Sequence, residues 1–109
     1  MQKFDLKKIA WKNLPKKTFI AKVNGEEQEV EIKALDGQEM LELQQLAENQ
    51  RLLFLLSKGL DCTMQEAQEI VKHDLNFSAE VAKNVLDLSS EFHQLMNEEV
   101  RGRSLTTTD

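Results

Sequence analysis

The chain of 109 residues is poor in cysteine, tyrosine and tryptophan. It holds one cysteine, so no disulfide can form within it and an oxidising compartment would not stabilise it. It has no tyrosine and one tryptophan, which disfavours an aromatic platform for sugars or nucleic acids. No stretch approaches the roughly 20 apolar residues that cross a bilayer, and the basic N-terminus lacks the apolar segment of a secretion signal. We therefore expect a cytoplasmic protein with no membrane partner.

The residues that could carry chemistry are few and scattered. Cys62 and the two histidines, His73 and His93, form no recognisable pairing of a nucleophile with a base. Together with Asp74 they also lack the closely spaced ligand pairs of structural zinc sites. The glycines stand far apart, at positions 25, 37, 59 and 102, so there is no phosphate-binding glycine loop. We expect no enzyme, no metal and no cofactor, and hence a protein that acts by binding.

The composition indicates one folded domain. Hydrophobic residues make up 40% and charged residues 30%, which is within the globular range. We expect a single domain over residues 1–103, composed of a basic arm (1–17), a β-hairpin (18–35) and a helical part (36–101). Residues 104–109 are expected to form a flexible tail.

Charge is unevenly distributed along the chain. The net charge is −5, but residues 1–22 carry seven lysines and one aspartate, whereas the remainder carries 7 basic and 18 acidic residues. The arm could dock on a charged partner, pair head to tail with another copy, or simply be solvated. Nucleic-acid binding is less favoured because the arm has no arginine and the acidic remainder would repel a polyanion. The lysines assigned to the arm are Lys7, Lys8, Lys12, Lys16 and Lys17.

Residues 18–35 alternate with a period of two, which predicts a β-hairpin. The turn is expected at Asn24-Gly25, and one face of the hairpin would hold Phe19, Ala21, Val23, Val30, Ile32 and Ala34. A Gly25-Glu26 loop would place Val23 beside Gln28 and Lys22 opposite Glu29. A register moved by two residues would keep the same faces, so the pairing stays open.

The period then becomes helical, and the sequence predicts two long helices and one short one. The fold class is thus mainly α with a small N-terminal hairpin (α+β). Capping boxes at Asp36/Glu39 and Thr63/Glu66 would open the first long helix and the short helix. The predicted ranges are Asp36 to Lys58 with a stop at Gly59, Thr63 to about His73-Asp74, and a cap at Asn76 or Ser78 to about Val100.

The first long helix is apolar on every side. The run Leu52 to Leu56 covers the whole circumference of a helix, which one small core could not receive. Either this helix is central and wrapped by the others, or one of its faces is an interface. From this surplus we predict self-association. The interaction residues would be Leu41, Leu52, Leu53, Leu55 and Leu56, with Leu86 and Val100 beside the main stripe of the last helix.

Three features follow one another along the chain: Leu14-Pro15-Lys16-Lys17-Thr18, the strand pair around Val23-Asn24-Gly25, and the late helix over residues 79–92. Their order resembles that of the tail assembly chaperones of long-tailed bacteriophages. The resemblance implies a non-structural factor in the host cytoplasm that binds the tape measure protein and helps recruit tail tube subunits. This chain would be the short, non-frameshifted form.

Two other interpretations of the same features stay open. One is a small dimeric regulatory or adaptor protein that uses the same apolar helix. The other is a nucleic-acid-associated accessory protein that uses the lysine arm.

Overall fold

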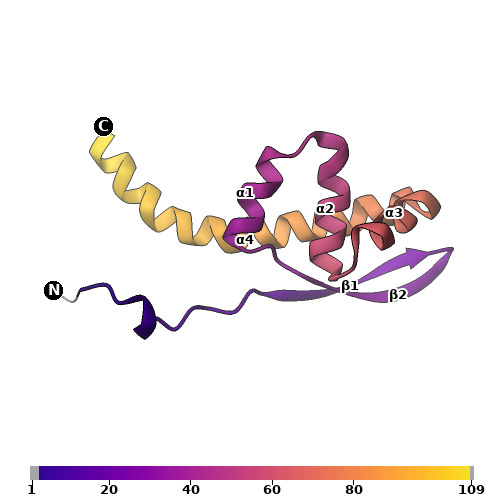
Figure 1. The fold of residues 1–109 in the computed structure, drawn as a ribbon, viewed down its shortest axis with the longest axis horizontal. Helices are drawn as coiled ribbons and strands as arrows, with labels where there is room; N and C mark the ends of the chain where they lie inside the picture. The colour runs from indigo at the N-terminus through magenta and orange to yellow at the C-terminus, as the bar shows by residue number, and fades with distance from the viewer. Residues whose placement is uncertain (1–2, 109) are drawn as a thin grey trace.

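The structure is a computed structural model that describes the backbone of residues 3–108 and the side chains of residues 3–93. Its elements are a short 3₁₀ helix (Leu6–Lys8), β1 (Lys16–Val23), β2 (Glu26–Lys33), α1 (Gly37–Gln45), α2 (Glu48–Leu60), α3 (Met64–His73) and α4 (Leu75–Thr108). The hairpin lies along one side of the helices, and α4 runs lengthwise through the molecule (Figure 1). The α+β class is confirmed, but the described residues form four α-helices where the sequence predicts three.

The hairpin is confirmed, with the alternative register. Val23 pairs with Glu26, Phe19 with Val30, and Lys22 with Glu27 rather than with Glu29. The loop is therefore Asn24-Gly25, and both residues have positive φ, 53° and 81°. A two-residue turn with this backbone matches the twist of the strands and favours Asn-Gly. Both registers keep the same apolar and polar faces, so the alternation alone does not choose between them. The backbone preference of Asn24-Gly25 decides the register.

The two faces of the hairpin differ as the alternation predicts. Ala21, Ile32 and Ala34 are buried under the helices, whereas Ile20 on the opposite face is 62% exposed. Phe19, Val23 and Val30 are half-buried along the same inner face. One side of the hairpin therefore belongs to the core and the other faces solvent.

The predicted single helix from Asp36 to Lys58 is wrong, because the chain breaks it into α1 and α2. Leu46 (φ −83°, ψ 149°) and Ala47 (φ −66°, ψ 154°) are extended. The guanidinium of Arg51 donates from Nε to the Leu46 carbonyl at 3.0 Å. A continuous helix would present its apolar faces in several directions. The break instead lets Leu43 of α1 and Phe54 of α2 join one core.

Both predicted capping boxes are confirmed, but the end of α2 and the start of α4 differ from the prediction. α2 ends at Leu60 with the left-handed Asp61 (φ 57°), so Gly59 lies inside the helix and does not stop it. The carboxylate of Asp74 caps α4 by accepting from the Phe77 amide at 3.0 Å, in place of Asn76 or Ser78. Ser78 is fully buried and its hydroxyl donates to the Asp74 carbonyl, so it faces inward. Asp74 satisfies a first-turn amide that no helical carbonyl can reach.

α4 organises the core and continues beyond it. It packs on α2, α3 and both strands. The most deeply buried large side chains are Ile32, Leu35, Leu56, Val81 and Val85. The helix extends to Thr108, past the end expected near Val100, so the backbone of the expected tail is helical as far as Thr108. Its last part projects away from the other elements (Figure 1).

Candidate protein-binding surfaces

The predicted leucine interface is mostly core. Leu56 is fully buried and Leu55 is 7% exposed, so the assignment of these two residues to a partner surface is corrected. Leu52 and Leu53 are half-buried and pack against the core. The break at Leu46–Ala47 explains this outcome, because it turns α1 and α2 toward the same interior. The apolar surface left for a partner is therefore much smaller than the surface predicted for one long helix.

Leu41 and Leu86 do reach the surface. Leu41 is 57% exposed and Leu86 is 39% exposed. Leu86 borders a hollow of about 230 Å³ between α1, α2 and α4, which is otherwise lined by Leu43, Gln44, Arg51 and Leu55. The structure thus brings Leu55 and Leu86 together at one shallow, largely apolar depression. Val100 lies outside the residues whose side chains are described.

A larger apolar surface lies in the N-terminal arm, here defined as residues 3–14. Phe4, Leu6 and Trp11 are 73%, 64% and 68% exposed, and Ile9 is 37% exposed. The Asp5 carboxylate accepts from the Lys7 amide at 3.1 Å and so holds the single 3₁₀ turn. The arm runs from the start of β1 in the direction away from the hairpin tip (Figure 1). These apolar residues have no regular period in the sequence, so no pattern predicts which of them are exposed.

The five predicted arm lysines divide into two groups. Lys7, Lys8 and Lys12 lie exposed in the arm. Lys16 and Lys17 belong to β1, so the arm ends earlier than the predicted residue 17. Lys16 lies 3.9 Å from the Glu31 carboxylate, and the ammonium of Lys17 donates to the Asn84 side chain at 3.3 Å. Lys16 therefore pairs within the hairpin, whereas Lys17 links β1 to α4.

A second depression, here called the hairpin-tip groove, lies between the end of the hairpin, α3 and the start of α4. It measures about 340 Å³. Its apolar lining comes from Val23, Ile70 and Phe77, all half-buried, and its polar lining includes Glu69 and Asp74. The residues that form it are distant in sequence and come together only in the folded chain, where the hairpin and α3 both pack on α4. Sequence reasoning did not find it.

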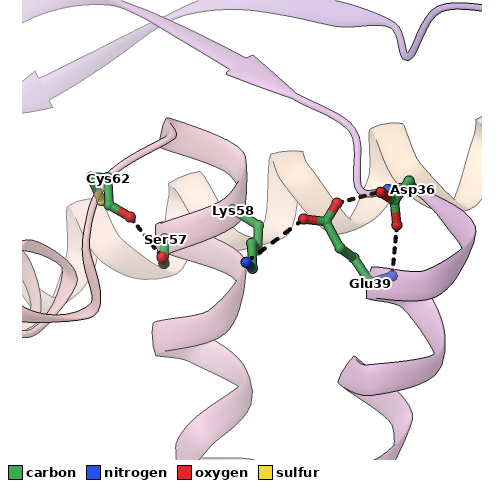
Figure 2. A network of polar contacts seen from close by, with 5 residues as sticks. All are labelled: Asp36, Glu39, Ser57, Lys58 and Cys62. Atoms are coloured by element: carbon green, nitrogen blue, oxygen red, sulfur yellow. Dashed lines mark hydrogen bonds and ion pairs between the residues drawn. The ribbon is translucent and has the colours of Figure 1, made fainter.

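The polar residues near Cys62 serve the fold. Burial raises the pKa of the Cys62 thiol above its ordinary value of 9.0, and the charges of Glu66 and Asp61 raise it further. The hydroxyl of Ser57 donates to the Cys62 carbonyl at 2.7 Å (Figure 2). The same figure shows Glu39 closing the capping box with Asp36 and lying 3.9 Å from the ammonium of Lys58, which links α1 to α2. A thiol held neutral in this way is a poor nucleophile.

Both histidines are engaged elsewhere. His73 lies 3.3 Å from the Glu69 carboxylate, and Nε2 of His93 donates to the Leu35 carbonyl at 2.7 Å. Among the described residues, no group of three or more histidine, cysteine, aspartate or glutamate side chains could hold a metal ion. In the part of the chain that the structure describes, no helix combines the length and the apolar character needed to cross a bilayer.

Comparison with known proteins adds no relationship. The chain matches no protein-family model, no curated protein and no solved structure.

Proposed function

We propose that this protein is a non-enzymatic protein-binding factor, and that it acts as a phage tail assembly chaperone. Its client would be the long, helical tape measure protein, and it would help to recruit tail tube subunits to that client. The resemblance of the element order to this family supplies the identity of the client. The observation that carries the binding role is the arm, which presents four large apolar side chains to solvent.

The energetics of the arm support a binding role. Burying one large apolar side chain contributes about 1.5–3 kcal/mol, so docking of the arm can contribute several times that amount. Part of the gain is offset by the entropy lost when the segment becomes ordered. Exposed apolar side chains carried between lysines suit a helical client that has an apolar stripe flanked by acidic residues. The depression beside Leu86 offers a second, smaller contact surface.

The test is co-expression with a long, helical tape measure protein of a long-tailed phage. We expect the client to stay soluble and to co-purify with the native chain. Replacement of the two exposed arm aromatics, Phe4→Ser with Trp11→Ser, should reduce client recovery several-fold, because the apolar contact is lost. Ile20→Ser is the matched control, since Ile20 is 62% exposed on the outer face of the hairpin. Equal client recovery with the arm variant and the control would contradict the proposal.

One observation favours a nucleic-acid role as the second candidate. Phe4 and Trp11 are exposed aromatics interleaved with lysines, a pattern that can stack on and neutralise a single strand. The acidic remainder of the chain opposes it. Binding of a labelled single-stranded oligonucleotide at low salt, with a steep loss as salt rises, would replace the chaperone role with this one. No binding at low salt would remove it.

A further inference from the structure

The arm and the hairpin-tip groove lie at opposite ends of the hairpin. The arm leads into Lys16, where β1 begins, whereas Val23, where β1 ends, lines the groove. Eight residues of strand at about 3.3 Å per residue separate these ends by roughly 25 Å. Figure 1 shows the arm leaving in the direction away from the hairpin tip. In this conformation the arm does not occupy the groove of its own chain.

The groove has an apolar floor and an acidic rim. Val23, Ile70 and Phe77 supply the apolar surface, and Glu69 and Asp74 carry negative charge beside it. The hairpin tip adds two exposed glutamates, Glu26 and Glu27. Among the residues that line the groove, the one basic group is His73, which lies 3.3 Å from Glu69. The lining therefore holds two carboxylates and no lysine.

The arm has the complementary composition. It places exposed apolar side chains next to lysines, and its one acidic residue, Asp5, is used to hold its own 3₁₀ turn. The other depression, beside Leu86, is a poorer match, because its lining includes the cationic Arg51 and no carboxylate, whereas the groove is lined by Glu69 and Asp74. Charge complementarity selects between these two surfaces, since like charges across an interface disfavour docking.

We propose that the arm of one copy docks in the hairpin-tip groove of a second copy. The contact is head to tail, because the two surfaces lie at opposite ends of the hairpin. A copy whose arm is bound by a second copy still has an empty groove. The second copy, whose groove is occupied, still has an unbound arm. Such heterologous contacts form a ring if the rotation closes and an open chain if it does not. This inference goes beyond the proposed function because it needs no client.

Association of the purified chain provides the first test. The mass measured by light scattering should rise with protein concentration, and the emission of Trp11 should shift to shorter wavelength as its side chain becomes buried. Trp11 is the only tryptophan, so the emission reports on the arm alone. Both changes should weaken as salt increases, because salt screens the charge pairing. A monomer at every concentration, or association without a change in Trp11 emission, would overturn the proposal.

A charge-swap experiment identifies the two surfaces. The arm variant Lys7→Glu/Lys8→Glu and the groove variant Glu26→Lys/Glu69→Lys should each raise the apparent dissociation constant at least about tenfold. Mixing the two variants restores opposite charges at both contacts, so the mixture should associate as the native chain does. The control Glu42→Lys/Asp87→Lys reverses exposed acids next to Leu41, Leu43 and Leu86, and should associate normally.

Recovery in the mixture also shows that both variants fold. A mixture that stays monomeric would overturn the proposal. So would an association that only the control variant abolishes, because this would place the contact at the depression beside Leu86. A chain that associates by the arm but leaves its tape measure client insoluble would refute the chaperone role and leave the head-to-tail contact standing.

Discussion

Gly59 shows how one residue sets the distance between two helices. It lies inside α2, where glycine is about 1 kcal/mol less favourable than alanine, so its presence needs a reason. A Cβ at this position would overlap Cγ2 of Val85, a fully buried side chain of α4. The missing side chain therefore permits the close approach of α2 and α4.

We predict that Gly59→Ala lowers the free energy of unfolding by about 1–3 kcal/mol, because the overlap forces the helices apart. Urea denaturation of the native chain and the variant measures this difference. Gly37→Ala is the control, since no atom lies within 4 Å of a Cβ there. Adding Val85→Ala to the first variant should cost less than the sum of the two single changes. Equal effects at Gly59 and Gly37 would contradict the close-packing explanation.

Cys62 should react slowly in the folded protein. Its pKa is raised from 9.0, first by burial and then by Glu66 and Asp61, so less thiolate is present at any given pH than in the unfolded chain. We expect iodoacetamide to modify Cys62 several-fold more slowly at pH 8 in buffer than in urea. Because the folded state binds this proton more tightly, the contribution of Cys62 to the free energy of unfolding is constant below the unfolded pKa. That contribution falls as the pH rises above 9. Equal rates in the two solvents would show that the thiol is not shielded.

At the scale of the elements, the break between α1 and α2 is the main departure from the expected fold. α2 begins at Glu48, and Ala47 precedes it without a side-chain hydrogen bond to the first turn. An alanine is a poor residue at this position, whereas serine or aspartate would accept from the free amides.

We predict that Ala47→Ser raises the free energy of unfolding by about 0.5–2 kcal/mol. Glu48→Pro should also be tolerated, because Glu48 is the first helical residue and Ala47 is already extended. In a continuous helix the same proline would cost about 3 kcal/mol. Thermal denaturation followed by circular dichroism distinguishes the two cases. Arg51→Pro, inside α2, serves as the control that should be strongly destabilising.

Local signals explain which elements could be predicted from the sequence. The Asn24-Gly25 turn and the two capping boxes depend on residues close together in the chain, so they were predicted correctly. The break at Leu46–Ala47 has no glycine, proline or capping side chain to mark it, and only the packing of α1 and α2 on a shared core explains it. The cap of α4 was misplaced because Ser78, a plausible cap by type, points into the core.

The candidate surfaces could be predicted only where they depend on residues close together in the chain. The exposed arm lysines follow directly from the charge distribution. The leucine interface failed at Leu55 and Leu56, because it assumed one straight helix. The hairpin-tip groove joins Val23 to Phe77, and no local pattern connects residues so far apart.

At the scale of the whole molecule, one backbone position ties the hairpin to the helices. The Leu35 amide donates to the Ser89 hydroxyl at 2.8 Å, and its carbonyl accepts from His93 at 2.7 Å. The Ser89 hydroxyl in turn donates to the Val85 carbonyl at 2.7 Å. Both Leu35 and Ser89 are fully buried, so water cannot replace these partners.

We predict that Ser89→Ala lowers the free energy of unfolding by about 1–3 kcal/mol, because the Leu35 amide is left buried without an acceptor. Amide hydrogen exchange at Leu35, together with urea denaturation, measures the effect. Ser90→Ala, at the neighbouring half-buried serine, should change stability by less than about 0.5 kcal/mol. An equal decrease in the free energy of unfolding for Ser89→Ala and Ser90→Ala would contradict a stabilising role of the hydrogen bond between Leu35 and Ser89.

The position of α4 in the chain affects when the protein can fold during synthesis. α4 is the partner on which the hairpin, α2 and α3 all pack, yet it follows them in the sequence. These earlier elements leave the ribosome before their shared support has been made. A two-stranded hairpin is only marginally stable alone. The nascent chain is therefore expected to stay largely unfolded until residues 75–93 have emerged, and then to fold in a single cooperative step.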